Sequence, residues 1–331
     1  MRPVGEQVIV ITGGSSGIGR ATAIAAGRQG AKVVLAGRGA DALEAAGVEV
    51  ETAGGQALTV PTDVAAADQV AELGRRAVAR FGRIDTWVNN AAVTAYGTFA
   101  DSPPDEFRRV VEVNLVGTAN GTRVALDHLR AEGGTIVNVA SGLGERAVPL
   151  QAAYCASKFG VRGFSESVRV ELEHDSVPVR LSVIKPASMD TPLFRHARTR
   201  MGVEPRPVPP VYDPELVAEA ILYAATHPVR ELAVGGASAG LRWFQQLSPR
   251  LLDAQLRVAG FRAQQEVDHP KGPEAGDNLE AASAGPGAVR GGYGGRRFSL
   301  GSWLGMHPAA RRGAATGAAA VAGLILARSR R

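Results

Sequence analysis

Short apolar runs and longer amphipathic segments alternate along the first two-thirds of the chain. The apolar runs are rich in β-branched residues and do not alternate with polar ones, which is typical of strands buried on both faces of a parallel sheet. The pattern predicts strands at Gln7–Ile11, Lys32–Ala36, Gln56–Pro61, Asp85–Asn89, Thr135–Val139, Arg180–Lys185 and, with a weaker pattern, Glu231–Val234.

The segments between these runs are longer and rich in alanine, as expected for helices. Repeated strand–helix units joined by right-handed crossovers give an α/β fold, a doubly wound parallel sheet of the Rossmann type, with about seven strands and helices on both faces. Ligands of such a sheet bind at the carboxyl ends of its strands. The predicted helices are Gly17–Gln29, Ala40–Ala53, Ala65–Phe81, Asp105–Leu129, Gln151–Glu173 and Pro214–Thr226.

The rhythm breaks twice towards the C-terminus. Between Pro186 and Pro214 the chain is rich in Pro and Arg without a sustained period, which predicts a long functional loop, such as a lid or a substrate loop. After about Gly235 the strand–helix pattern stops. We expect a catalytic domain over residues 1–240, a helical extension over 241–267, a Gly-rich and disordered or loosely attached linker over 268–301, and an apolar, basic tail over 302–331.

The segment Gly313–Ala327 is apolar and has arginines on both sides. It is shorter than the roughly 20 residues that a membrane-spanning helix needs, and it consists mostly of Ala and Gly. Three interpretations stay open: packing on the body or on a second subunit, attachment to a membrane with the arginines at the headgroups, or disorder.

Composition excludes some function classes. The chain has 331 residues, 45% of them hydrophobic and 21% charged, which suits a globular protein with a sizeable core. The net charge of +5 could suggest nucleic acid, but no nucleic-acid motif accompanies it. The basic residues gather instead in the C-terminal part, at Arg296, Arg297, Arg311, Arg312, Arg328, Arg330 and Arg331.

The single cysteine, Cys155, excludes an internal disulfide and fits a reducing compartment. The first predicted strand begins too early for a cleaved signal peptide, so we expect a cytoplasmic catalytic body. The six histidines show no metal-ligand spacing, and no metal site is expected.

A glycine-rich turn follows the first predicted strand and opens the first helix, with the sequence TGGSSGIG from Thr12 to Gly19. Gly13 permits a tight turn, Gly17 lets the backbone approach a phosphate, and Gly19 allows close packing of helix on strand. The helix N-terminus supplies free N–H donors to a pyrophosphate. In this context the turn predicts a dinucleotide site that includes Gly13, Ser15, Ser16, Gly17, Ile18 and Gly19.

The second strand ends at Gly37-Arg38, where a site for NAD would carry an acidic residue for the ribose hydroxyls. Gly37 leaves room and the Arg38 guanidinium suits a 2′-phosphate. The sequence therefore favours NADP(H), with NAD as the alternative and a solvated surface arginine as the competing interpretation of Arg38.

Tyr154 and Lys158 are four residues apart on a predicted helix, so both side chains point along one face. A neighbouring ammonium favours the phenolate and is expected to lower the tyrosine pKa towards the working pH. Tyr154 could then exchange a proton as hydride moves, while Ser141, at the end of a strand, hydrogen-bonds the substrate oxygen. Such a pair is common on helix surfaces, and it gains meaning from the nucleotide-binding turn.

Together these motifs resemble the short-chain dehydrogenase/reductase family in its short single-domain form. The match runs from about Gln7 to Gly236 and rests on TGGSSGIG, Asp63-Val64 after the third strand, NNAA at Asn89–Ala92, Asn114 in VNLVGT, VASG at 139–142 and YCASK at 154–158.

The resemblance implies roles for further residues. Asp63 and Val64 would contact the adenine, Asn90 and Ala91 would lie along the cofactor, and Asn114 would hold a water in a proton relay with Lys158. We expect three further positions near the nicotinamide, Pro186, Ala187 and Thr191. Of these, Thr191 can reach the carboxamide.

Two residues depart from the family pattern. Ala92 stands in place of the glycine of NNAG, and Ala187 in place of the glycine after Pro186. Neither change removes a catalytic group, so activity is expected to survive both.

The sequence thus predicts an NADP(H)-dependent oxidoreductase acting on a carbonyl or alcohol carbon, with Asn114, Ser141, Tyr154 and Lys158 as catalytic residues. The alternatives are a nucleotide-binding regulator without chemistry and a membrane-associated reductase of a lipophilic substrate. The resemblance also suggests a homodimer or homotetramer. No pattern rule identifies the small-molecule substrate, since specificity resides in the loop after Pro186.

Overall fold

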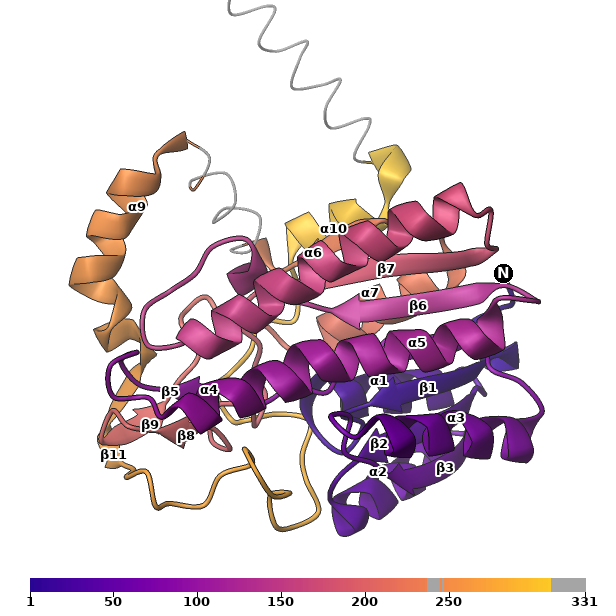
Figure 1. The fold of residues 1–331 in the computed structure, drawn as a ribbon, viewed down its shortest axis with the longest axis horizontal. Helices are drawn as coiled ribbons and strands as arrows, with labels where there is room; N and C mark the ends of the chain where they lie inside the picture. The colour runs from indigo at the N-terminus through magenta and orange to yellow at the C-terminus, as the bar shows by residue number, and fades with distance from the viewer. Residues whose placement is uncertain (237–244, 246, 311–331) are drawn as a thin grey trace, which may run out of the picture.

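The computed structural model describes residues 1–236, 245 and 247–310. Its centre is a parallel sheet with strand order β10-β7-β6-β4-β1-β2-β3, which confirms the doubly wound fold (Figure 1). Every neighbouring pair in this sheet runs parallel. The strands are β1 (Val8–Thr12), β2 (Lys32–Gly37), β3 (Gln56–Pro61), β4 (Thr86–Asn89), β6 (Gly134–Val139), β7 (Val179–Pro186) and β10 (Glu231–Val234).

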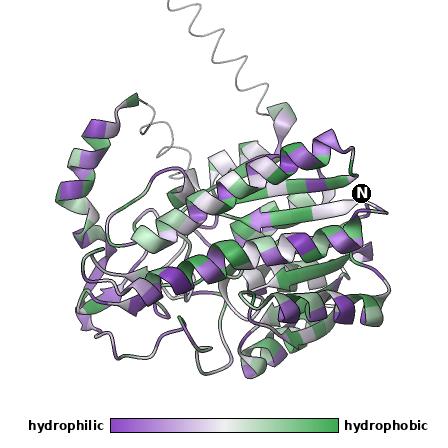
Figure 2. Ribbon diagram, in the orientation of Figure 1, coloured by the Kyte–Doolittle hydropathy of each residue, from purple (hydrophilic) through white to green (hydrophobic). Residues whose placement is uncertain are grey.

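Helices cover both faces of the sheet, and the strand side chains alternate between two hydrophobic clusters. Val8, Val10 and Trp87 pack with α3, α4, α5 and α6 on one face, and Ile9 and Ile11 pack with α1, α2 and α7 on the other. Figure 2 shows hydrophobic residues gathered in the strands. The helices are α1 (Gly17–Gly27), α2 (Ala40–Thr52), α3 (Ala67–Phe81), α4 (Pro104–Val111), α5 (Gly117–Leu129), α6 (Ala152–His174) and α7 (Glu215–Thr226).

The predicted helix over Asp105–Leu129 is interrupted in the middle. A π-helical turn, η2 (Glu112–Val116), joins α4 to α5 and contains Asn114. Single π turns inside α-helices are frequent at functional sites. Periodicity did not indicate this turn, because one inserted residue hardly disturbs the apolar spacing of a long helix.

The loop after β7 and the C-terminal extension form a layer at the carboxyl ends of the strands. In the loop, β8 (Arg198–Thr199) pairs with β5 (Ala95–Tyr96), and β9 (Val203–Pro205) pairs with the extension. The extension contains α9 (Pro249–Gln255), a π turn at Leu256–Gly260, a 3-10 turn at Arg262–Gln264, β11 (Gln265–Pro270) and α10 (Leu300–Met306).

The expected loose linker over 268–301 lies against the body instead. Between β11 and α10, residues 271–299, which we call the strap, run without helix or strand towards α2 and back (Figure 1). The Leu279 side chain is 0% exposed, and the Asp190 carboxylate accepts four main-chain N–H groups from residues 291–295. The glycines predicted disorder by composition, but here they permit a path close to the protein surface.

Within the described residues, no helix is both long and apolar enough to cross a membrane. The tail segment Gly313–Ala327 lies outside the described residues, as do residues 241–244 and 246 of the helical extension predicted over 241–267.

A buried amide network ties the centre of the sheet to α5 and α6. Trp87 Nε1 donates to Asn89 Oδ1 (2.8 Å), and Asn89 Nδ2 donates to Asn138 Oδ1 (2.9 Å). Asn138 Nδ2 in turn donates to Ser165 Oγ (2.9 Å). A Cβ at Gly121 of α5 would lie only 2.0 Å from Asn89 Oδ1, so this network requires a glycine there.

We therefore predict that Gly121→Ala lowers the free energy of unfolding by about 1–3 kcal/mol, since it overpacks the core and displaces a hydrogen-bonded amide. Gly163→Ala is the matched control: Gly163 lies on an exposed part of α6 with nothing within 4 Å of an added Cβ. It should raise the stability by roughly 0.5–1 kcal/mol through helix propensity. Urea unfolding followed by circular dichroism measures both, and equal effects would contradict the packing argument.

Candidate active site

A cleft of about 350 Å³ lies at the carboxyl ends of the strands. The strand order reverses between β1 and β4, which is where a doubly wound sheet opens a crevice for ligands. All predicted cofactor residues except Gly19 line this cleft, namely Gly13, Ser15, Ser16, Gly17, Ile18, Arg38, Asp63, Val64, Asn90, Ala91, Tyr154, Lys158, Pro186, Ala187 and Thr191.

The glycine-rich turn has the geometry that its sequence predicts. Gly13 and Gly17 have φ of +67° and +54°, which side chains rarely tolerate. A Cβ at Gly19 would lie 2.1 Å from the Gly13 carbonyl oxygen, so Gly19 serves packing and does not face the cleft. Ser16, the N-cap of α1, makes no side-chain capping bond. Of the first-turn N–H groups, which suit an anion, that of Gly17 is bound by the Ala288 carbonyl (2.9 Å).

At one end of the cleft, the charged residues already have protein partners. Asp63 accepts a hydrogen bond from Arg109 (2.5 Å). Burial is the largest single influence on Asp63 and opposes its ionisation. The hydrogen bonds from Arg109 and the Ala65 N–H, with the charges of Arg109 and Arg38, together outweigh burial and hold the carboxyl pKa below its ordinary value. Arg38, expected to face a 2′-phosphate, donates to the main-chain carbonyls of residues 278–280 in the strap.

At the other end, Ser141, Tyr154 and Lys158 come together. Ser141 follows β6, and the other two lie one turn apart on α6, with all three side chains buried. The Tyr154 phenol is hydrogen-bonded to Ser141. Lys158 Nζ lies 5.5 Å from the centre of the Tyr154 ring and donates to the Val139 carbonyl (2.9 Å).

The ionisation of this pair differs from the expectation. Burial raises the pKa of Tyr154 to about 12, a change that the Ser141 hydrogen bond only partly offsets. Burial also lowers the pKa of Lys158 to about 8. The expected lowering of the phenol pKa is absent because desolvation dominates and the amine lies over the ring face, bound to a carbonyl. At neutral pH the pair is a neutral phenol beside a largely protonated amine.

Asn114 is fully buried in the π turn and does not line the cleft. Its side chain binds the main chain of Val93 through both amide atoms (2.8 and 3.0 Å), and its Nδ2 also donates to Ser157 Oγ (3.0 Å). These bonds join the loop after β4 to α6, one residue before Lys158. The relay role of Asn114 stays a prediction.

The two departures from the family pattern are accommodated. Ala92 and Ala187 both line the cleft, and neither has positive φ. The Ala187 methyl would lie 2.8 Å from a Cβ at Gly235, so the glycine that follows β10 makes room for it. Thr191 lies against Gly17 of the glycine-rich turn.

The sequence did not indicate the residues that surround the predicted reaction centre. Tyr96 lines the cleft, and its hydroxyl is buried without a hydrogen-bond partner among the described residues. Gln151 and Gln264 bind each other (2.7 Å). Tyr96 lies in a two-residue strand, Gln151 is the N-cap of α6 and Gln264 belongs to the extension, so no periodicity signals their role. The neighbouring apolar lining consists of Val93, Leu143, Val148, Leu193, Phe194 and Leu256.

Comparison with known proteins gives a consistent result. A family model described as short chain dehydrogenase matches residues 7–202. The uncharacterised oxidoreductase YxnA of Bacillus subtilis is 38% identical over 288 residues, covering 86% of this chain and 81% of the relative. Since so much of the chain is covered, that match continues beyond residue 240 into the extension.

Two solved structures share the fold. An alcohol dehydrogenase from the archaeon Thermococcus sibiricus, complexed with 5-hydroxy-NADP, has a TM-score of 0.61 and 27% identity, covering 69% of this chain and 95% of that one. A short-chain type dehydrogenase/reductase from Mycobacterium marinum has a TM-score of 0.63 and 26% identity, covering 71% and 96%.

We predict that the Tyr154 phenol stays protonated at least to about pH 10 in the cofactor-free protein, because burial disfavours the phenolate. Carbon NMR of ring-labelled tyrosine follows this ionisation, and Tyr154→Phe assigns the signal. In Lys158→Met the phenol should also stay protonated over this pH range. If the phenol ionises below about pH 9 in the wild type but not in Lys158→Met, the Lys158 ammonium would be the dominant influence on the phenol pKa, which would contradict the prediction.

Proposed function

The chain belongs to the short-chain dehydrogenase family, and on that premise we propose that it is an NADP(H)-dependent oxidoreductase with Tyr154 as its proton-transfer residue. Hydride would move between the nicotinamide and a carbonyl or alcohol carbon. The observation that carries the proposal is the meeting of Ser141, Tyr154 and Lys158 in the same cleft as the glycine-rich turn. A nucleotide-binding regulator without chemistry would not need this complete set.

The cleft fits a dinucleotide. Positive φ at Gly13 and Gly17 and a first turn of α1 without a side-chain cap suit a pyrophosphate, which would replace the Ala288 carbonyl at the Gly17 N–H. In the proposed arrangement Asp63 and Val64 hold the adenine end of the cofactor. Lys158 binds the nicotinamide ribose, and Thr191 binds the carboxamide. When bound, the cofactor supplies or accepts the hydride, and the protein supplies orientation and the proton.

The protonation states support carbonyl reduction as the easier direction. A neutral phenol with a pKa near 12 is a proton donor at neutral pH, and it can protonate the substrate oxygen as negative charge develops there. Ser141 supplies a second hydrogen bond to that oxygen. Lys158 keeps positive charge nearby, so the tyrosinate left behind is stabilised.

The end of the cleft at Ser141, Tyr154 and Lys158, which we call the reaction end, has a lining that supports an apolar substrate. Leu143, Val148 and Phe194 face the cleft, and the amide groups of Gln151 and Gln264, which also line it, bind each other. This favours a lipophilic ketone, aldehyde or alcohol. Whether the tail attaches to a membrane, and whether the protein forms a dimer or tetramer, stay predictions from the sequence.

Preference for NADP(H) is supported by the charges around Arg38. A second cavity of about 280 Å³ adjoins the cleft, and its lining includes Ser15, Arg38, Arg195 and Arg290. Of the five N–H donors of the Arg38 guanidinium, Nη1 uses two and Nη2 one on the strap carbonyls, which leaves two for a phosphate. The proposal is also supported by the archaeal alcohol dehydrogenase, whose structure was solved in complex with 5-hydroxy-NADP.

Tyr154→Phe should reduce kcat by about 10²–10⁴-fold with apolar ketones while NADPH binding stays nearly unchanged, because only the transferable proton is lost. NADPH absorbance measures turnover, and fluorescence titration measures binding. Tyr223→Phe is the control, since Tyr223 stacks on His227 away from the cleft. Turnover in Tyr154→Phe comparable to the wild type would refute the assignment.

Arg38→Asp should shift the ratio of NADPH to NADH affinity towards NADH by about tenfold or more, as expected for loss of a charge-assisted hydrogen bond. Only the ratio is diagnostic, because Arg38 also holds the strap, and loss of that contact acts on both cofactors alike. An unchanged ratio would mean that another group recognises the 2′-phosphate.

A further inference from the structure

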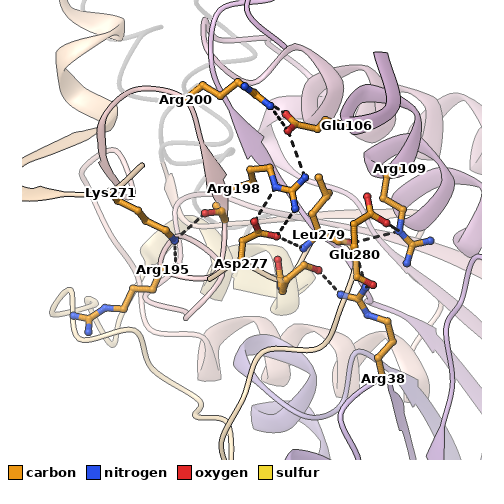
Figure 3. Close-up of polar contacts among 12 residues, drawn as sticks. Arg38, Glu106, Arg109, Arg195, Arg198, Arg200, Lys271, Asp277, Leu279 and Glu280 are labelled. Carbon is orange, nitrogen blue, oxygen red and sulfur yellow. Dashed lines mark hydrogen bonds and ion pairs between the residues drawn. The ribbon is translucent and has the colours of Figure 1, made fainter. Parts of the chain in front are cut away.

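The strap crosses the cleft at its Arg38 end, opposite the proton-transfer residues. Figure 3 shows Arg38 and Arg109 pointing at the main chain around Leu279 and Glu280. Arg38 Nη1 donates to the Leu279 and Glu280 carbonyls (3.1 and 2.8 Å) and Nη2 to that of Asn278. Arg109 Nε donates to the Leu279 carbonyl (3.2 Å).

An apolar anchor and an ion pair hold this part of the strap down. The Leu279 side chain is fully buried and belongs to the hydrophobic cluster that includes Val60 and Val64. Asp277 pairs with Arg198 of β8 (2.8 Å) and its Oδ1 accepts from the Leu279 N–H (2.8 Å). The strap is therefore attached to the sheet and to the loop after β7 at once.

The returning part of the strap contacts the glycine-rich turn itself. The Gly17 N–H donates to the Ala288 carbonyl (2.9 Å), and Arg20 Nη1 donates to the Pro286 carbonyl (2.5 Å). Further on, the four N–H groups bound by Asp190 hold residues 291–295 beside Thr191.

A space remains between the strap and the body. The cavity of about 280 Å³ has Ser15, Ser16 and Gly39 on the side of the body and residues 282–285, 287 and 288 on the side of the strap. Because the main cleft also reaches Arg38, Asp63 and Asn278, the adenosine end of the cofactor path keeps open volume beneath a cover.

We propose that the strap is the outer wall of the cofactor site: it closes over the adenosine half of the dinucleotide, orients Arg38 towards the 2′-phosphate, and opens for the cofactor to enter or leave. This inference rests on the proposed function. It assigns to the C-terminal extension a binding and gating role that the glycine-rich turn alone would not require.

A disulfide can test the gate directly. An ideal Cβ at Gly39 lies 3.3 Å from the Ala282 Cβ, close to the separation of about 3.5–4.5 Å in disulfides, and Gly39 has φ of −85°, which other residues adopt. In the double variant Gly39→Cys/Ala282→Cys, oxidation would lock the strap and reduction would free it. Ala282→Cys alone is the control, since the native Cys155 is buried.

The readout is NADPH fluorescence after mixing with excess NADP⁺. We expect the disulfide to form with NADPH bound, and the oxidised, loaded protein to release NADPH about tenfold or more slowly than after reduction, as for a barrier raised by 1.4 kcal/mol or more. Equal release rates would overturn the proposal. So would a disulfide that forms only without NADPH, because the strap would then occupy the place of the cofactor.

Leu279→Ala tests the same wall without a cross-link. Loss of the buried anchor should weaken strap docking and speed the release of NADPH and NADH alike by about tenfold or more. Leu300→Ala, at a leucine 60% exposed in the same extension, should change neither rate. Tighter binding or unchanged rates in a folded Leu279→Ala protein would sink the proposal. A wild type that binds neither nucleotide would instead sink the proposed function.

Discussion

Burial of the Lys158 amine beside the Tyr154 phenol is the constraint on which the proposed chemistry depends. Both groups lie on one turn of α6, and desolvation moves their pKa values in opposite directions, towards about 12 for the phenol and about 8 for the amine. Desolvation favours the neutral form of each. The phenol is thus kept protonated as a proton donor. Lys158 is the residue whose charge responds to the pH and to a bound ligand.

This burial is possible because the surrounding polar groups are paired. Lys158 donates to the Val139 carbonyl at the end of β6, and Ser157 binds Asn114, which holds the main chain of Val93. The π turn brings Asn114 into this position from the helix between β4 and β6. The reaction end of the cleft is therefore supported by strand ends and by two helices at once, which keeps its side chains in one arrangement.

The sequence predicted those features that depend on a residue type with a single physical use. Uninterrupted apolar runs predicted the seven strands, because a sheet covered on both faces leaves no polar positions. Gly13 and Gly17 predicted the turn, because few other residues adopt their φ values. The sign of the Tyr154 pKa shift was wrong, since the spacing of Tyr154 and Lys158 states their proximity but not their burial. The strap was unpredictable for a similar reason: its contacts use main-chain carbonyls, which every residue has.

The two parts of the C-terminal extension divide the cleft between them. Leu256, Gly260 and Gln264 line its reaction end, while the strap covers the end at Arg38 and Asp63. A cover that excludes water from the strand ends strengthens every charge interaction beneath it. In the proposed NADP(H) complex, the Arg38 guanidinium would bind two partners of the same kind, the strap carbonyls and the phosphate oxygens. Its bonds to the strap hold the guanidinium in place before a phosphate arrives, so less side-chain entropy is lost on binding. The extension is accordingly part of the site, and its attachment to Arg38 couples cofactor recognition to closure of the cleft.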